Sequence, residues 1–204
     1  MIQIGANDGK YEYSKESGKD FIFDFLLTNP YWQAVLVEPI PSVFTELKKN
    51  YSQHKNQIAF VNNAITERTE TRELEISGKE GKNSSFFKRP QSLIGKIRSI
   101  LKHNNKIKIN VNCISYNELC SIQNLKEVDF IKIDAEGYDE IIIESILHTD
   151  QSNLIPKVFF WEKNTHTNNT CEEKLSNLGY HIFLSGLNKS GNYMDRVAIH
   201  SSIL

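Results

Sequence analysis

Short runs of strand-forming apolar residues alternate with helix-patterned segments along most of this 204-residue chain. The strand-like runs are "MIQIG", "QAVLVEP", "QIAFVNNAI", "IKINVNCIS", "VDFIKID" and "KVFFWE", and most segments between them have apolar residues at helical spacing. Neighbouring parallel strands need such a crossover connection, usually a helix. The pattern therefore predicts a doubly wound α/β domain, in which helices cover both faces of a mostly parallel sheet.

The C-terminal stretch departs from this alternation. Its two strand-like runs, "YHIFL" and "DRVAIHSSI", are joined by a Gly/Asn/Ser-rich connection that is too short for a crossover helix. We therefore expect them to pair antiparallel. Length and composition fit one domain over residues 1–204, with a basic insertion or lid at about residues 79–106.

Polar residues stand where the expected strands end. They are the turn "GANDG" at 5–9, Glu38, "NNA" at 62–64, Asp134 with Glu136, and Glu162. In open α/β sheets, ligands bind at the carboxyl ends of the strands. The sequence thus predicts a ligand cleft along this edge of the sheet, which accounts for acids that directly follow an apolar core strand.

The turn "GANDG" discriminates between cofactors. A dinucleotide-binding turn has glycines where a pyrophosphate approaches the backbone, whereas this turn has Asn7 at the second glycine position and the carboxylate of Asp8 close by. A ribose cofactor without phosphate and with a cationic end fits better, and S-adenosylmethionine (SAM) is one. Glu38 could accept hydrogen bonds from the ribose hydroxyls of NAD or SAM alike. The plain alternative is a tight turn with Asp8 as a cap.

Five segments together resemble a known family. "QIGANDG", "VLVEPIPSVFTELKKNY", "FVNNAI", "VDFIKIDAEGYDEIIIESI" and "VFFWE" occur in the order and spacing of the FkbM family of SAM-dependent methyltransferases, across most of residues 2–163. The resemblance implies the Rossmann-like class I fold with its seven-stranded type of sheet. It also implies SAM as cofactor and, most often, O-methylation of a hydroxyl on a sugar, glycan, glycolipid or natural product.

The resemblance also implies roles for single residues. Gly5, Asp8 and Gly9 would surround the methionine end of SAM, with Asn7 in the same turn. Glu38 would bind the ribose, Asn63 and Ala64 the adenine, and Asp134 would face the transferring methyl group. Many members have an acid where this chain has Gln3, an amide that supplies no charge to the ammonium group of SAM, and Asp8 could compensate.

Methyl transfer to a hydroxyl needs a general base or a metal ion that lowers the pKa of the hydroxyl. Asp134 and Glu162 end neighbouring expected strands and could share a divalent cation such as Mg²⁺, a route that we favour slightly. His166, four residues after Glu162, is the competing base. Glu136 and Asp139 lie at the start of an expected helix, where acids also complement the helix dipole.

The positive charge of the chain is concentrated in one segment. Nine basic residues and one acid lie between residues 79 and 108, although the whole chain has a net charge of -1. Leu93, Ile94, Ile97, Ile100 and Leu101 have amphipathic helical spacing, which fits a solvated surface helix or a lid. A lid of this charge would attract an anionic or lipid-linked acceptor, the latter at a membrane surface.

Features that the sequence lacks argue against several other classes of protein. No apolar run approaches a membrane span and no signal pattern opens the chain, so we expect a cytoplasmic protein, peripheral at the inner membrane face if its acceptor is lipid-linked. We expect no nucleic-acid partner, because no stacking platform or groove-reading helix is recognisable. A non-catalytic SAM-binding or partner-binding module and a nucleotide-cofactor oxidoreductase are the alternatives to a methyltransferase.

Overall fold

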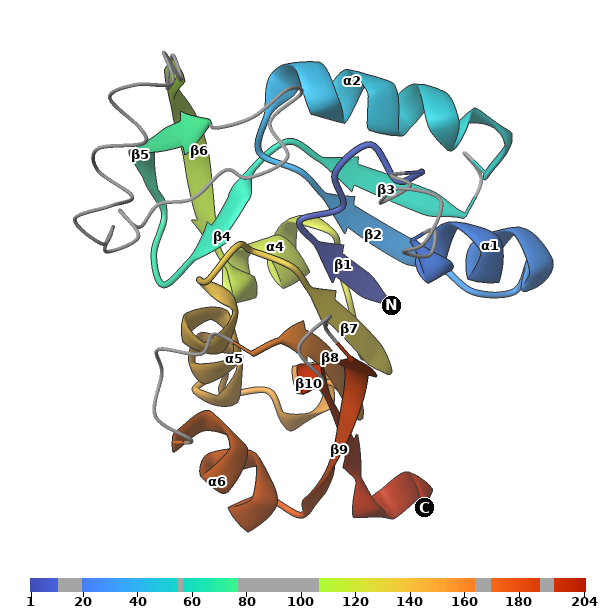
Figure 1. The fold of residues 1–204 in the computed structure, drawn as a ribbon, viewed down its shortest axis with the longest axis vertical. Coiled ribbons are helices and arrows are strands. Elements are labelled where there is room, and N and C mark those ends of the chain that lie inside the picture. The colour runs from blue at the N-terminus through green and yellow to red at the C-terminus, as the bar shows by residue number, and fades with distance from the viewer. Residues whose placement is uncertain (11–19, 55–56, 77–106, 164–169, 188–192) are drawn as a thin grey trace.

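The computed structural model describes residues 1–10, 20–54, 57–76, 107–163, 170–187 and 193–204. Its main sheet has seven strands in the order β3-β2-β1-β7-β8-β10-β9 (Figure 1). The strands are β1 (Ile2–Ile4), β2 (Ala34–Val37), β3 (Ile58–Val61), β7 (Phe130–Ile133), β8 (Val158–Glu162), β9 (Tyr180–Leu187) and β10 (Tyr193–His200).

Strand direction follows the sequence pattern. β1 lies in the middle and pairs parallel with β2 and β7, and the parallel pairing continues from β2 to β3 and from β7 to β8. β10 pairs antiparallel with both β8 and β9, because the chain returns from β9 through a connection too short for a crossover helix. The expected α/β fold with an antiparallel C-terminal pair is confirmed.

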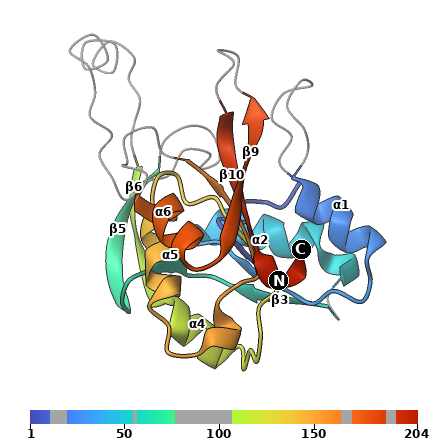
Figure 2. The same ribbon diagram turned by 90° about the horizontal axis from the view of Figure 1, so that it is seen from below.

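Helices cover both faces of the main sheet, as Figure 2 shows. Helices α1 (Phe21–Thr28) and α2 (Pro41–Asn50) pack on one face, against alternate strand residues such as Leu36 and Phe130. Helices α4 (Tyr116–Ile122), α5 (Asp139–Leu147) and α6 (Thr170–Asn177) pack on the other face, against residues such as Ile4 and Trp161. Short 3₁₀ turns are at Ser52–His54, Ser152–Leu154 and Ser201–Ile203.

A second sheet has three strands, β4 (Ala64–Thr66), β6 (Ile107–Ser115) and β5 (Glu70–Ile76), in that order. The prediction of one strand through "QIAFVNNAI" is therefore wrong, since the run is divided between β3 in the main sheet and β4 in the second one. The break falls at Asn62, whose Nδ2 donates to the carbonyl of Glu38 at 2.8 Å. This bond ties the break to the end of β2.

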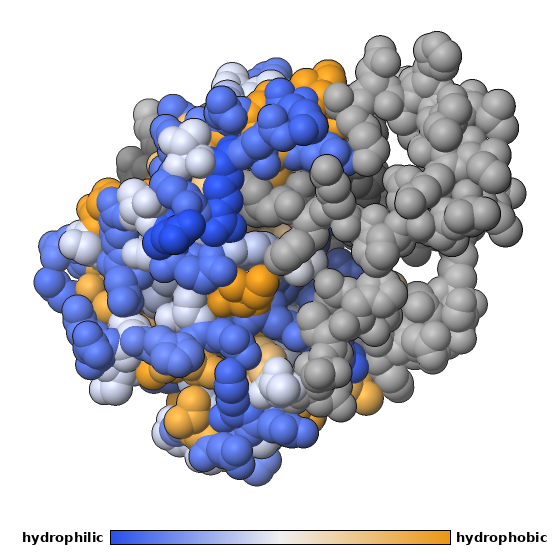
Figure 3. All heavy atoms as spheres, turned by 90° about the vertical axis from the view of Figure 1, so that its left-hand side faces the viewer, coloured by the Kyte–Doolittle hydropathy of each residue, from blue (hydrophilic) through white to orange (hydrophobic). Residues whose placement is uncertain are grey.

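The surface on the side of the second sheet, α5 and α6 is mostly hydrophilic where the structure describes it, with apolar side chains in small separate patches (Figure 3). Glu73 and Lys108, which form an ion pair across β5 and β6, are both about half exposed. Within the described ranges, no helix has the length and apolar character needed to span a bilayer.

Candidate active site at the carboxyl edge of the main sheet

The register of the main sheet places five residues in one row. Side chains of directly paired residues point to the same face, so the α1/α2 face carries Leu36, Gln3, Lys132, Phe160 and Val197. Two residues farther toward the carboxyl ends of the parallel strands, the next row consists of Glu38, Gly5, Asp134, Glu162 and Asp195, of which the first three stand just after their strands. Asp195 is paired directly with Glu162, and the N–H of Asp134 donates to the carbonyl of Ile4 at 3.0 Å.

The turn after β1 needs its glycines. Gly5 and Gly9 have φ angles of 75° and 73°, and Asn7 between them has 49°, all in the left-handed region that glycine and asparagine tolerate best. A β-carbon on Gly5 would overlap the carbonyl oxygen of Asp134, and one on Gly9 would overlap the ring of Tyr51. The turn therefore lies directly against the end of β7. The carboxylate of Asp8 accepts from the N–H of Lys10 at 3.0 Å, a contact within the turn, whereas the N-cap of α1 is Asp20.

Glu38 is a buried carboxylate at the end of β2, only 5% exposed. It accepts the backbone N–H of Asn7 at 3.0 Å and that of Ile40 at 2.9 Å, which ties the β1 turn to the start of α2. Burial raises the pKa of Glu38 to about 7, although these two hydrogen bonds oppose the shift. Each carboxylate oxygen keeps a lone pair for a further donor, so Glu38 can accept from a ligand hydroxyl as well.

Asp134 stands at the end of β7 with its side chain 45% exposed. One of its oxygens lies 3.8 Å from the ammonium of Lys132, two residues earlier on the same face. Partial loss of hydration raises the pKa of Asp134; the charge of Lys132 opposes this rise and the charge of Asp20 adds to it. The Asp134 carboxylate is therefore partly accessible to solvent and lies close to charged side chains.

The turn from β7 to α5 is held by Asp139. Its carboxylate accepts the N–H of Ala135 at 3.3 Å and that of Gly137 at 3.1 Å, across a turn in which Glu136 and Gly137 have φ of 50° and 97°. Asp139 is 2% exposed, and burial, followed by the charge of Asp134, raises its pKa to about 8. We therefore assign Asp139 to shaping the turn that carries Asp134.

Of the other residues predicted from the sequence, one lies in this row and two lie at the second sheet. Glu162 ends β8 beside Asp134, as expected. Asn63 precedes β4 and donates through Nδ2 to the carbonyl of Asn112 at 3.3 Å, in the second sheet. Ala64 is the first residue of β4 and is buried. His166 and the basic segment at 79–106 lie outside the described residues.

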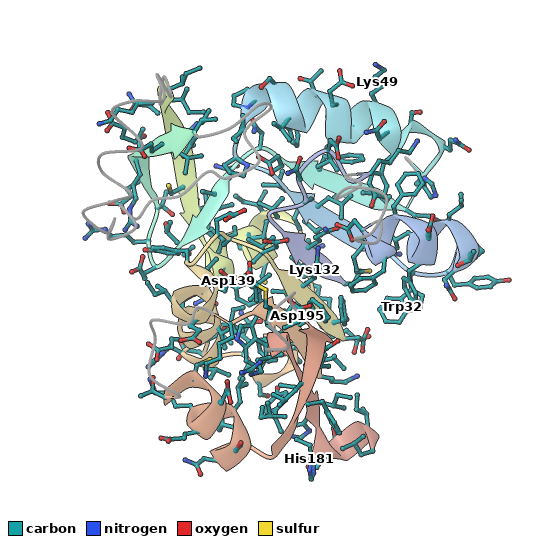
Figure 4. All side chains as sticks on the ribbon, in the orientation of Figure 1. Trp32, Lys49, Lys132, Asp139, His181 and Asp195 are labelled. Atoms are coloured by element: carbon teal, nitrogen blue, oxygen red, sulfur yellow. The ribbon has the colours of Figure 1, made fainter. Side chains whose placement is uncertain are left out.

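Three charged residues of this region were not predicted from the sequence: Lys132, Asp20 and Asp195. Lys132 contacts both Asp20, at 3.2 Å, and Asp134. The charges of Asp134 and Lys132 both act on the pKa of Asp195, which places Asp195 beside them, and Figure 4 shows Lys132, Asp139 and Asp195 around the central strands. Among the described residues, no group of three His, Cys, Asp or Glu side chains is arranged to hold a metal ion.

Comparison with models of known protein families identifies the family of this chain. Residues 3–182 match the profile described as "Methyltransferase FkbM domain", which covers most of the chain, including the whole row except Asp195. The chain belongs to the FkbM methyltransferase family. At the family level it is thus a SAM-dependent methyltransferase, and the resemblance inferred from the five segments is confirmed.

Solved structures similar to this chain have low sequence identity with it. An uncharacterized protein from Listeria monocytogenes serotype 4b has a TM-score of 0.50 and 11% identity, over 98% of this chain and 60% of that one. Precorrin-6y C5,15-methyltransferase from Geobacter metallireducens GS-15 has a TM-score of 0.49 and 12% identity, over 98% and 79%.

A third structure, M. capricolum TrmK in complex with S-adenosyl-homocysteine (SAH), has a TM-score of 0.47 and 11% identity, over 97% of this chain and 59% of that one. The FkbM chain thus spans about three fifths of TrmK and of the Listeria protein. Comparison with curated protein sequences gave no match.

The described residues fit SAM. A buried carboxylate follows β2, and each of its oxygens accepts one backbone N–H and retains a lone pair to which a ribose hydroxyl can donate. Asp8 in the glycine turn would repel a phosphate but not the cationic methionine end of SAM.

Proposed function

We propose that this FkbM chain is an O-methyltransferase that transfers the methyl group of SAM to a hydroxyl of a sugar, a glycan or a related polyhydroxylated acceptor. The observation that carries the proposal is the row at the carboxyl edge, in which Gly5 lies between Glu38, directly after β2, and Asp134, directly after β7. Such a row offers a ribose-binding carboxylate on one side of the glycine turn and a partly exposed carboxylate on the other.

Glu38 would bind the ribose hydroxyls, and Gly5, Asn7, Asp8 and Gly9 would border the methionine end, with Asn63 and Ala64 toward the adenine. SAM, when bound, supplies a methyl group on a positively charged sulfur. The neighbouring carboxylates Asp8 and Asp134 would favour that charge at this edge of the sheet.

Asp134 would act as the general base. A hydroxyl is a poor nucleophile while it is protonated, so its proton must leave as its oxygen bonds the methyl carbon. A carboxylate at the end of a core strand is held by the sheet and can take that proton at a fixed position. Glu162 and Asp195, in the same row, would accept hydrogen bonds from further hydroxyls of the acceptor.

Two other routes to the same reaction remain as proposals. In the metal route, Asp134 and Glu162 would bind a divalent cation such as Mg²⁺, and acceptor or water oxygens would complete the shell. We place this route second, because Asp134 and Glu162 supply only two protein ligands. In the other route, His166 would replace Asp134 as the base.

The acceptor's charge is a further proposal. The nine basic residues between 79 and 108 would attract an anionic or lipid-linked glycan if they border the site. No nucleic acid is proposed as acceptor.

Calorimetry with SAM, SAH and NAD tests the cofactor, and transfer of labelled methyl from SAM to a panel of glycans and small hydroxylated compounds tests the reaction. The proposal predicts binding of SAM and SAH, no binding of NAD, and label in an ether that is stable to base. Binding of NAD alone would favour an oxidoreductase. Binding of SAM with no label in any acceptor would favour a non-catalytic member of the family.

A further inference from the structure

A side chain of the second sheet is bonded to the turn that follows β7. Nη1 of Arg72, on β5, donates to the hydroxyl of Tyr138 at 2.6 Å, and the guanidinium lies 5.7 Å from the centre of the Tyr138 ring. Tyr138 is 4% exposed and is the N-cap residue of α5. The second sheet therefore contacts the turn that leads from Asp134 into α5.

Arg72 is fixed by more than this one bond. Its Nε donates to Glu70 on the same strand, and its Nη2 donates at 3.3 Å to Glu67, in the connection between β4 and β5. The hydroxyl of Tyr138 also donates to Glu67. A guanidinium carries its donors in a rigid planar fork, so Arg72 can hold the phenol and both carboxylates at once. The phenol of Tyr138 is thus held between Arg72 and Glu67.

The turn after β7 needs support of this kind. Glu136 has a φ of 50° and Gly137 one of 97°, and a non-glycine residue persists in the left-handed region only where the surrounding structure holds it there. Asp139 holds the turn from α5, through the N–H groups of Ala135 and Gly137. The bonds to Tyr138 hold the turn from the second sheet. Two independent sets of contacts therefore fix its conformation.

We propose that Arg72 is a positioning residue for methyl transfer, which, through Tyr138, fixes the turn after β7 and with it the place at which Asp134 meets the acceptor. This inference rests on the proposed function. It extends the groups on which the reaction depends from the carboxyl edge of the main sheet to a strand of the second sheet.

Two substitutions break the same bond from opposite sides. Arg72→Met removes the guanidinium, and Tyr138→Phe keeps the ring and removes only the hydroxyl. Each should lower kcat by roughly tenfold or more, because a small misplacement of the reacting groups is costly. The double variant should be no slower than the slower single variant, since the two residues act through one contact.

Two further readouts separate positioning from general damage. Arg72→Lys keeps the charge without the fork, so it should recover only part of the lost rate. SAH affinity should stay at the wild-type value in all of these variants, because Glu38 and the glycine turn are unchanged.

Hydrogen exchange of the Ala135 and Gly137 amides, followed by NMR, measures the hold on the turn without any acceptor. Exchange should be several-fold faster in Arg72→Met and Tyr138→Phe than in the wild type. Arg68→Met is the matched control, because Arg68 pairs with Glu70 at 2.9 Å, as Arg72 also does, but its side chain is 75% exposed and is not bonded to Tyr138. It should change neither the exchange nor kcat.

Wild-type kcat or wild-type amide exchange in folded Arg72→Met and Tyr138→Phe would overturn the inference. So would an equal loss of kcat in Arg68→Met, additive losses in the double variant, or a loss of SAH affinity as large as the loss of kcat. If Arg72→Met does not fold, Tyr138→Phe decides the question. Failure of the proposed function is distinguishable, because the wild type itself would then transfer no methyl group to any acceptor.

Discussion

A β-carbon on Gly5 would overlap the backbone carbonyl oxygen of Asp134. The turn after the first strand and the end of β7 are thus in direct contact, and the N–H of Asp134 donates back to Ile4 at 3.0 Å, which prevents β7 from moving away. Glycine at position 5 is what lets the proposed cofactor turn and the proposed base share one edge of the sheet.

Gly5→Ala should therefore both destabilise the fold and abolish SAH binding. Its φ of 75° alone makes alanine unfavourable by more than about 1 kcal/mol, and the overlap with a backbone atom adds to this. Gly179→Ala is the control: its φ is 90°, but its nearest neighbour would be Ser201 Oγ at 3.4 Å. Urea unfolding of both variants separates the effect of the positive φ from the effect of the overlap. Equal losses of unfolding free energy in the two variants would show that the contact with Asp134 is unimportant.

Glu38→Ala should weaken SAH binding by about 1.5 to 3 kcal/mol, since a charged acceptor of the ribose hydroxyls is lost. The wild-type pKa of about 7 adds a pH dependence. The ionised carboxylate is the better acceptor, so SAH affinity should rise as pH increases through 7, and Glu38→Gln should flatten this rise. Calorimetry between pH 6 and 8 checks both effects. Exposed Glu46, paired with Lys49, is the control position, and wild-type affinity in folded Glu38→Ala would remove Glu38 from the site.

The buried Asp139 should make the fold less stable as pH rises. Its folded pKa of about 8 lies above its ordinary value, so the folded state binds the proton more tightly than the unfolded chain. The free energy of unfolding should then fall between about pH 4 and 8, by up to about 1.4 kcal/mol per pH unit. Asp139→Asn, which keeps one acceptor for the turn, should reduce this slope in urea unfolding at several pH values; an unchanged slope would contradict the assignment.

Metal removal should leave catalysis intact if Asp134 acts directly as the base. Dialysis against EDTA is expected to change neither SAH affinity nor the rate of labelled methyl transfer. Loss of turnover with intact SAH binding, restored by Mg²⁺, would instead favour a metal at Asp134 and Glu162.

Much of this site could be predicted because parallel strands bring successive strand ends to one edge. Gly5, Glu38, Asp134 and Glu162 each follow an apolar run in the sequence, and register then places them in one row. Local pattern was sufficient here, since each residue only needed its own strand to be recognised.

The rest depended on tertiary pairing. In the sequence, Lys132 is an interior residue of the strand-like run "FIKI". Its contact with Asp20 depends on where α1 packs against the sheet. Asp195 joins the row because β10 runs antiparallel with Asp195 opposite Glu162, a register that no local pattern specifies. The division of "QIAFVNNAI" between two sheets was likewise invisible, since both halves have strand-like composition.

The rate of labelled methyl transfer by Asp134→Asn tests the central claim most directly. Asparagine keeps the shape of the side chain and removes its capacity to take a proton. The account predicts a variant that folds, binds SAH with wild-type affinity and has a kcat lower by roughly 10² or more. A folded, SAH-binding Asp134→Asn protein with a kcat close to that of the wild type would contradict it.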